Sequence, residues 1–195
     1  TIGVRGVAYL LVLFLFVQCN QDRSIAVRQM NEALNEMKAG RTAAALDLLK
    51  QAASRDLTYA DPSYYLGQIH HQKYHQYDDA QKYYQEAIER DNTNAQFYYG
   101  LGSVYALQSK HQLAIDVFGK AIEREKNFAK AHFRLALSQR MRGQYQEAAE
   151  SFGRAIMLAP SLDFGEEGQS GILFHELGDL YLQFRLFAQA QQVYQ

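Results

Sequence analysis

Small and apolar residues recur along most of the chain at spacings of three and four residues. In each complete copy an alanine is followed four residues later by a large apolar residue and seven residues later by another alanine, as in Ala45, Leu49 and Ala52. Residues at these spacings share one face of a helix, so each copy predicts an amphipathic helix. The leading alanines of the copies are Ala45, Ala80, Ala114, Ala148 and Ala190.

A second small residue precedes every copy by twelve or thirteen positions. These residues are Ala33, Gly67, Gly102, Ala136 and Gly178. Two antiparallel helices approach closely only where one of them presents a small side chain, and a large residue one turn away fills the space beside it. Each copy therefore predicts a helical hairpin. Because a lone hairpin cannot bury its apolar face, neighbouring hairpins are expected to stack.

The leading alanines lie about 34 residues apart, with one longer step of 42 residues before the last. The third copy is the fullest and contains Tyr98, Leu101, Gly102, Tyr105, Ala114, Phe118 and Ala121. This pattern resembles the tetratricopeptide repeat (TPR) family, whose motif is Trp-x2-Leu-Gly-x2-Tyr followed by Ala-x3-Phe. The resemblance implies an all-α fold, a solenoid of helix-turn-helix repeats in a right-handed superhelix, with about four and a half repeats.

The repeat frame divides the chain into segments. Four repeats are predicted at 26–59, 60–94, 95–128 and 129–162, and a partial fifth repeat at 171–195. The second repeat carries one extra residue before Ala80, and the acidic, glycine-containing insert 163–170 is expected to form a surface loop. Because solenoids need a polar terminal cap and none follows, we expect the natural protein to continue beyond Gln195.

An apolar run precedes the repeats. Residues 7–17 are eleven apolar residues without a charge, and Arg5 lies just before them. A membrane-spanning helix needs about 20 apolar residues, so the run is too short to span a bilayer and instead predicts a signal peptide over residues 1–18. A secreted protein without an anchor and an uncleaved anchor remain alternatives.

The single cysteine of the chain, Cys19, lies just after this run, separated from it by Gln18. The arrangement resembles the signal of bacterial lipoproteins. The resemblance implies that the Cys19 thiol is acylated, that residues 19–25 form a short tether, and that the exported protein faces the periplasm. Gln18 and Phe16 depart from that family, which prefers a small residue and a leucine at these positions. Asn20, in place of aspartate, implies the outer rather than the inner membrane.

The repeat resemblance also implies where a partner binds. In the family the first helix of each repeat lines a concave groove through its second, fifth, sixth, ninth, twelfth and thirteenth positions. The fifth positions here hold Met30, Tyr64, Tyr99, Phe133 and His175. Large aromatic side chains provide wide contact area at low entropic cost, so this ladder predicts a peptide-binding surface. Support of the neighbouring helices is the alternative role for the same side chains.

Three cations extend the predicted groove. Lys130 and Arg134 occupy the second and sixth positions of the fourth repeat, on one helical face. Family members that hold the terminal carboxylate of a peptide use Lys and Arg there. The other positions of that clamp carry Gly100, Tyr64 and Gln68. We therefore expect Lys130, Arg134 and Arg140 to form a basic patch for an acidic peptide segment, with a solvated helix face as the alternative.

Candidates for catalysis and metal binding are few. His71 and His75 have the spacing of a helical metal site, but the extra residue of the second repeat falls here, where the helix is expected to end. His175 and Glu176 begin a metalloprotease motif in which Asp179 replaces the second histidine. The sequence contains no phosphate-binding loop and no nucleophile elbow. We expect no catalytic residues, no metal and no cofactor.

Composition narrows the class of partner. The 195 residues include 20 Lys+Arg and 21 Asp+Glu, and this balance lacks the basic excess of nucleic-acid-binding proteins. We expect a protein or peptide in the groove, a membrane contact through Cys19, and neither a nucleic acid nor a small-molecule substrate. The leading hypothesis is a non-catalytic scaffold of the bacterial cell envelope that assists assembly of an envelope complex. The alternative is a docking arm of a larger exported enzyme whose catalytic domain lies beyond residue 195.

Overall fold

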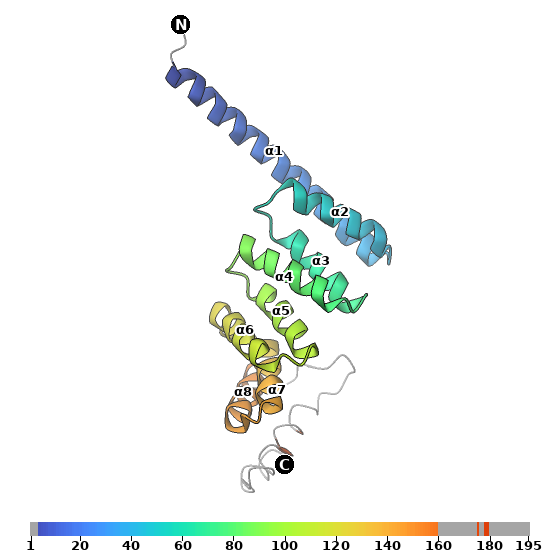
Figure 1. Cartoon of the computed structure of the whole chain (residues 1–195), viewed down its shortest axis with the longest axis vertical. Coiled ribbons are helices and arrows are strands. Elements are labelled where there is room, and N and C mark those ends of the chain that lie inside the picture. Colours follow the sequence, from blue (N-terminus) through green and yellow to red (C-terminus); the bar gives the residue numbers. More distant parts are fainter. Residues whose placement is uncertain (1–3, 160–174, 176–177, 180–195) are drawn as a thin grey trace. The chain divides into compact units, whose positions relative to one another are not determined.

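The computed structural model describes residues 4–159, 175, 178 and 179. Within residues 4–159 the chain forms eight helices, and no strand occurs among the described residues. The chain divides into two compact units, residues 1–92 and residues 93–195. The predicted all-α fold is confirmed (Figure 1).

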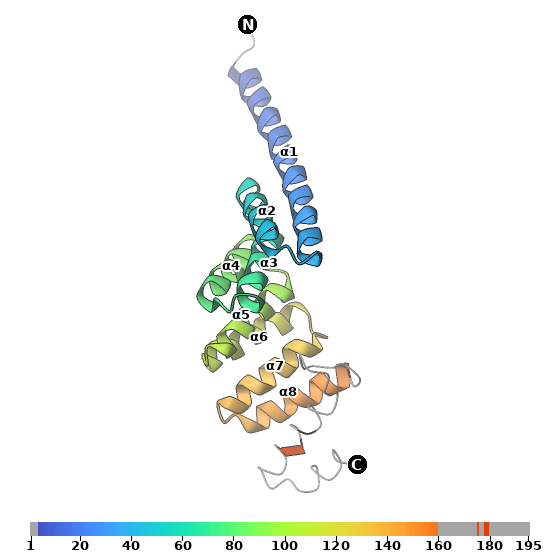
Figure 2. The same cartoon turned by 90° about the vertical axis from the view of Figure 1, so that its right-hand side faces the viewer.

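The first unit is a pair of stacked helical hairpins. Its helices are α1 (Val4–Lys38), α2 (Thr42–Arg55), α3 (Asp61–Gln72) and α4 (Tyr77–Arg90). α1 packs against α2, and α3 packs against α4. The two hairpins stack because α2 also packs against α3, as Figures 1 and 2 show.

The second unit has the same plan. Its helices are α5 (Ala95–Leu107), α6 (His111–Arg124), α7 (Ala129–Met141) and α8 (Tyr145–Leu158). The hairpins are α5–α6 and α7–α8, with α6 packed on α7 and a further contact between α5 and α7. We call the first helix of each hairpin helix A and the second helix B. The insert 163–170 and Ala190 lie outside the described residues.

The small residues of the repeat lie where the two helices of a hairpin meet. The alanines at these positions are fully buried, namely Ala33, Ala45, Ala80, Ala114, Ala136 and Ala148. Gly67 and Gly102, which occupy the same repeat position as Ala33, are also buried. The rings of Tyr84 and Phe118 lie directly against these two glycines. The close approach of paired helices that the sequence predicts is therefore present in both units.

Every turn from helix A to helix B contains one residue in the left-handed backbone region. These residues are Gly40 (φ 75°), His75 (φ 54°), Ser109 (φ 57°) and Gly143 (φ 75°). In three of the turns the next residue donates its N–H to the carbonyl five residues earlier, as Lys110 does to Tyr105 at 2.9 Å. In the second turn the bond runs from Gln76 to His70, six residues earlier. The extra residue of the second repeat is thus absorbed in this turn, and α3 ends at Gln72.

α1 extends far beyond the helix that the repeat pattern predicts. The pattern predicts a helix from Ala26, whereas α1 runs without a break from Val4 to Lys38. No glycine or proline lies between Cys19 and Ala26 to end a helix. The predicted tether is therefore helical, and the six residues after Cys19 rise by about 9 Å instead of about 20 Å. Among the helices of residues 4–159, none combines the length and the apolar character needed to cross a membrane.

Side-chain contacts hold this extension on the second helix. Arg23 Nη1 donates a hydrogen bond to Asp56 Oδ2 at 3.0 Å, and Arg55 Nη1 donates to Asp22 Oδ1 at 3.1 Å. The Arg23 guanidinium also lies 4.1 Å from the centroid of the Tyr59 ring, which is a cation–π distance. Residues before the first predicted repeat therefore contribute to the packing of the first unit.

Asp56 and Arg90 fix the turn between α2 and α3. Asp56 Oδ1 accepts hydrogen bonds from the backbone N–H and the hydroxyl of Thr58, at 2.8 and 2.7 Å. Burial alone would raise the pKa of Asp56, but the hydrogen bonds from Thr58 and then from Arg23 lower it below its ordinary value. Arg90 Nη1 donates to the carbonyl of Tyr59 at 3.0 Å. This bond ties α4 to the same turn.

Candidate functional site

The fifth-position side chains on α5 and α7 pack toward the core to different depths. Phe133 is 5 % exposed, and its ring centroid lies 5.7 Å from that of Phe152 on α8. Tyr99 is half-buried, and its ring centroid lies 5.9 Å from Phe118 and 5.1 Å from Phe128. Both rings pack against other aromatic rings, and Tyr99 retains partial exposure.

The first unit repeats this arrangement. Met30 is 3 % exposed. Tyr64 is half-buried, and its ring centroid lies 5.3 Å from Tyr65 and 5.8 Å from Tyr84. Its hydroxyl accepts a hydrogen bond from Gln68 Nε2 at 2.9 Å. In each unit, then, one fifth-position side chain is buried and the other keeps part of its surface exposed.

The histidines do not form a common site in the described structure. His175 is exposed, and its Nε2 lies 3.6 Å from Asp179 Oδ2. His71 Nδ1 lies 3.5 Å from Tyr84 Oη, and His75 lies in the turn after α3, so helical spacing does not relate the two. Residues 4–159, 175, 178 and 179 contain no group of three or more His, Cys, Asp or Glu that could hold a metal ion.

The charges on α5 and α7 are all positive. α5 contains no charged residue, and α7 contains Lys130, Arg134 and Arg140 but no aspartate or glutamate. Lys130 is exposed, whereas Arg134 and Arg140 are half-buried. Arg134 Nε is buried without a hydrogen-bond partner in the part of the chain that the structure describes. An unsatisfied buried polar atom carries an energetic cost, and the half-buried side chain leaves only its other atoms accessible to a partner.

One face of α7 carries the second, sixth, ninth and thirteenth positions of its repeat. These residues are Lys130, Arg134, Leu137 and Met141. The same positions of α5 hold Gln96, Gly100, Ser103 and Leu107. Met141 is 62 % exposed and Leu107 is 54 % exposed. We call this surface the α5–α7 stripe: on α7 its cations lie toward the beginning of the helix, and its exposed apolar residues lie at the ends of both helices.

Leu107 and Met141 are absent from the ladder predicted from the sequence, which follows the fifth positions. The large apolar residues with exposed side chains among the described residues are Val27, Leu57, Tyr74, Leu107, Leu113, Met141, Met157 and Leu158. Within that set only Leu107 and Met141 share one repeat position. The sequence could have predicted that Leu107 and Met141 belong to the site, because the thirteenth position is one of the groove positions that the resemblance implies.

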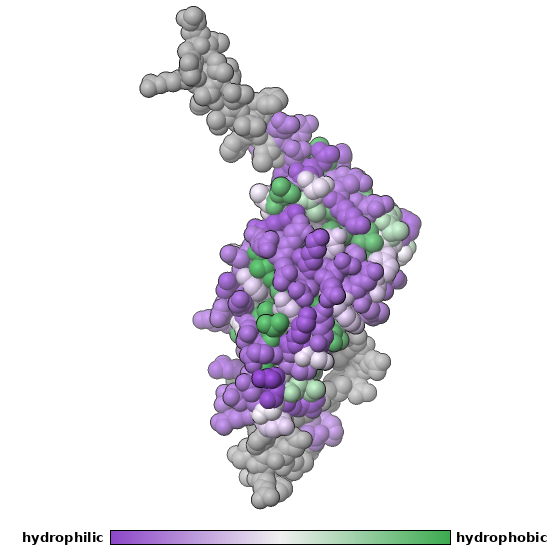
Figure 3. All heavy atoms as spheres, viewed as in Figure 1, coloured by the Kyte–Doolittle hydropathy of each residue, from purple (hydrophilic) through white to green (hydrophobic). Residues whose placement is uncertain are grey.

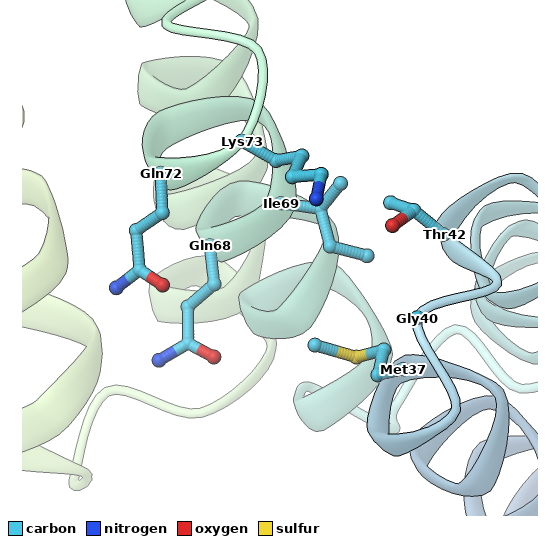
Figure 4. Close-up of a pocket in the computed structure, with 7 residues that line it drawn as sticks. All are labelled: Met37, Gly40, Thr42, Gln68, Ile69, Gln72 and Lys73. Atoms are coloured by element: carbon cyan, nitrogen blue, oxygen red, sulfur yellow. The ribbon is translucent and has the colours of Figure 1, made fainter.

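In the first unit a pocket opens where the end of α1, the start of α2 and the end of α3 meet. Its volume is about 220 Å³, and its lining residues are Met37, Gly40, Thr42, Gln68, Ile69, Gln72 and Lys73. Figure 4 shows Gln68 and Gln72 one above the other on α3, with Met37 and Ile69 on the side toward α1. The two amides offer donors and acceptors for a peptide backbone beside an apolar wall. Gln68 and Gln72 are the ninth and thirteenth positions of their repeat.

The face of the molecule drawn in Figure 3 is mostly hydrophilic over the described residues. Hydrophobic residues appear on it in small separate groups. A monomeric soluble protein rarely exposes a large contiguous apolar patch, so this face has an ordinary surface. The candidate site is therefore defined by the positions of individual side chains in the repeat frame.

Family models match most of the repeat region. Residues 30–73 and 75–127 match a model described as tetratricopeptide repeat, and residues 129–162 match a second model with the same description. Together the matches cover about two thirds of the chain. No curated protein matches the sequence.

Solved structures share the fold. A crystal structure of MamA protein has a TM-score of 0.75 at 21% identity, covering 87% of this chain and 88% of that one. The structure of MamA 41-end from Desulfovibrio magneticus RS-1 has a TM-score of 0.73 at 18% identity, and the match covers 87% of this chain and 90% of that one. The structure of YrrB, described as a TPR protein with an unusual peptide-binding site, has a TM-score of 0.71 at 21% identity, and the match covers 86% of this chain and 82% of that one. At these identities the likeness shows the fold alone.

Proposed function

Because the chain belongs to the tetratricopeptide repeat family, we propose that it is a non-catalytic scaffold that binds a segment of another protein on its helices A. In the first unit the proposed contact residue is the partly exposed Tyr64, and in the second unit the proposed contact residues are Tyr99, Lys130, Arg134 and Arg140. The buried Phe133 supports the surface of the second unit from the core. His175, an exposed residue at the fifth position of the predicted fifth repeat, is proposed as a further contact.

The observation that carries the proposal is that some repeat positions on α5 and α7 are buried in packing while others remain exposed. On α5 and α7 the fifth and eighth positions are used wholly in packing, as at Phe133 and Gly102, or partly, as at the half-buried Tyr99. The second and thirteenth positions keep exposed side chains that packing does not need, such as Lys130 and Met141. A row of side chains left exposed at fixed repeat positions is suited to a partner that runs across successive helices A.

Site-specific photocrosslinking tests this proposal. A benzoylphenylalanine at Gln96, an exposed second position on α5, is expected to form an adduct with a discrete protein partner in cells. The matched control is benzoylphenylalanine at Gln112, which is also exposed but lies on α6, a helix B. Equal adducts at both positions, or none at Gln96, would contradict binding on helices A.

We also propose that the scaffold works in the bacterial cell envelope, held to a membrane by a lipid on Cys19. The support is the charge-free apolar run 7–17 that ends just before the single cysteine. The helical segment after Cys19, held by the Arg23–Asp56 ion pair, would keep the first unit close to the lipid surface. On this proposal the protein faces the periplasm, and Asn20 supports the outer membrane as its place.

Metabolic labelling with an alkynyl fatty acid tests the lipid anchor. The natural chain is expected to incorporate the label and to fractionate with outer-membrane vesicles. Cys19→Ser should lose the label and the mature N-terminus, and because Cys19 is the single cysteine no other thiol can replace it. If the Cys19→Ser chain loses its signal peptide and sediments with membranes as the natural chain does, the lipid anchor is ruled out.

A further inference from the structure

We infer that the α5–α7 stripe binds an acidic segment that also carries large apolar side chains. The inference rests on the proposed function and specifies the partner of that surface. Its basis is the combination of charge, a guanidinium without an ion pair among the described residues and two exposed apolar residues within one unit.

Within residues 93–159 the acidic residues are confined to helices B and one turn, although helices B also carry cations such as Lys120 and Arg154. The acidic residues between positions 93 and 159 are Asp116, Glu123, Glu125, Glu147 and Glu150. All of them lie on helices B or in the turn after α6, and none lies on α5 or α7. Neither Lys130 nor Arg134 forms an ion pair within the described part of the chain. Lys130 and Arg134 therefore have no carboxylate partner among the described residues, and the stripe favours an anionic partner.

Arg134 gives the stripe a directional contact. Its side chain is half-buried, so part of it stays accessible, and it forms no ion pair among the described residues. A carboxylate can accept two parallel hydrogen bonds from one guanidinium, which is stronger and more specific than a contact with an ammonium. A partner carboxylate that contacts the accessible part of Arg134 would neutralise its charge, and Lys130 one turn earlier would attract a second acidic side chain.

The apolar end of the stripe sets the spacing in the partner. Met141 lies seven residues after Arg134, which is about 10.5 Å along a helix. An extended peptide covers about 3.3 Å per residue, so about three residues would separate its acidic and apolar groups. Leu107 on the neighbouring helix A occupies the same repeat position as Met141 and offers a second apolar contact. Methionine adapts its shape to varied apolar side chains, which suits such a surface.

Fluorescence anisotropy with defined probes tests the inference on the full chain. The probe is a twelve-residue labelled peptide with consecutive glutamates separated by three residues from two leucines, made in both sequence orders. We expect binding that weakens as salt rises, because exposed charges are screened. The same peptide with glutamine for glutamate should bind at least about tenfold more weakly, since a hydrogen bond to a charged group contributes about 1.5–3 kcal/mol.

Two matched pairs of variants locate the binding. K130E/R134E is expected to weaken binding at least about tenfold, whereas K120E/R154E, which makes the same charge change at exposed sites on helices B, should change it less than about twofold. Leu107→Ser with Met141→Ser should weaken binding, whereas Leu113→Ser on α6 should not. Unchanged thermal unfolding of each variant shows that the fold is intact.

Several outcomes overturn the inference. If the glutamate and glutamine peptides bind equally well, the charge of the peptide plays no role in binding. If K130E/R134E and K120E/R154E weaken binding equally, the attraction is not specific to the α5–α7 stripe. An oligothymidylate that binds at the stripe as tightly as the acidic peptide shows a general anion surface instead. If the crosslink at Gln96 still captures a protein while the acidic probe does not bind, the scaffold proposal stands and the acidic partner is wrong.

Discussion

Gly102 on α5 lies so close to the ring of Phe118 on α6 that a Cβ atom at Gly102 would come within 2.7 Å of Phe118 Cε1. The same relationship holds between Gly67 and Tyr84, where the distance to Cδ1 would be 2.8 Å. Atoms at these separations overlap. The fully buried Phe118 ring therefore fills the space of the missing side chain and sets how closely α5 approaches α6.

Gly102→Ala is expected to destabilise the chain. The added methyl forces the Phe118 ring to shift, which costs about 1–3 kcal/mol, and better helix propensity returns about 1 kcal/mol. The net loss in the free energy of unfolding should be up to about 2 kcal/mol, measured by urea denaturation.

Gly119 on α6 is the matched control, because a Cβ there meets nothing within 4 Å. Gly119→Ala gains helix propensity without a clash and should stabilise the chain by up to about 1 kcal/mol. Equal effects of the two substitutions would show that Phe118 does not limit the crossing.

Ser109 is expected to carry a conformational cost. It adopts φ 57° in the turn between α5 and α6, a region that costs an L-residue about 1–2 kcal/mol. Ser109→Gly removes that cost but makes the unfolded chain more flexible, so the net gain in stability should be up to about 1 kcal/mol. Gly143→Ala places a side chain at φ 75° in the equivalent turn and should lower the melting temperature. A Ser109→Gly chain that melts below the natural one contradicts this account.

The sequence predicts the hairpins well because their packing depends on residue size at fixed spacing. Ala33, Ala45 and Ala136 are each fully buried, as expected for small residues at a helix crossing. The size of each side chain and the number of residues between small side chains can be read directly from the sequence. The start of α1 could not be predicted in the same way. The contact of Arg23 with Asp56, which packs this extension on α2, joins residues 33 positions apart and has no signal in the repeat pattern.

The candidate site was less predictable than the fold. Phe133 and Tyr99 share one repeat position, yet the first is buried and the second is half-buried. The fifth position lies at the edge of the buried face, so exposure there depends on neighbouring rings such as Phe152 and Phe128. A sequence pattern shows which residues share a face, but the depth of each side chain is set by tertiary packing.

Phe133→Ala tests whether this ring belongs mainly to the core. Removing a buried phenylalanine ring costs about 3–5 kcal/mol, through lost transfer free energy and the cavity left behind. Leu107→Ala, at a side chain that is 54 % exposed, should change stability by less than about 0.5 kcal/mol. Urea denaturation of both variants gives the comparison. If Phe133→Ala costs no more than Leu107→Ala, the ring is a free binding anchor and its packing on Phe152 contributes little.

Asp56 makes the stability of the first unit depend on pH. Its pKa is lower in the folded chain than in the unfolded chain, because the hydrogen bonds from Thr58 and Arg23 outweigh the effect of burial. A carboxyl group with a lowered folded pKa stabilises the fold above its unfolded pKa of about 3.9, and that stability is lost as the pH falls through the folded pKa. Protonation also breaks the ion pair that holds α1 on the α2–α3 turn.

Asp56→Asn is therefore expected to lower the free energy of unfolding at pH 7, and this effect should shrink as the pH falls below the unfolded pKa and through the lower folded pKa of Asp56, where the natural carboxyl group is itself protonated. The measurement is urea denaturation of both chains from pH 7 to pH 2.5. Asp47→Asn on the exposed face of α2 is the control for loss of one acidic residue. A stability difference between the natural chain and Asp56→Asn that stays constant over this range would mean that the Asp56 charge does not hold α1 in place.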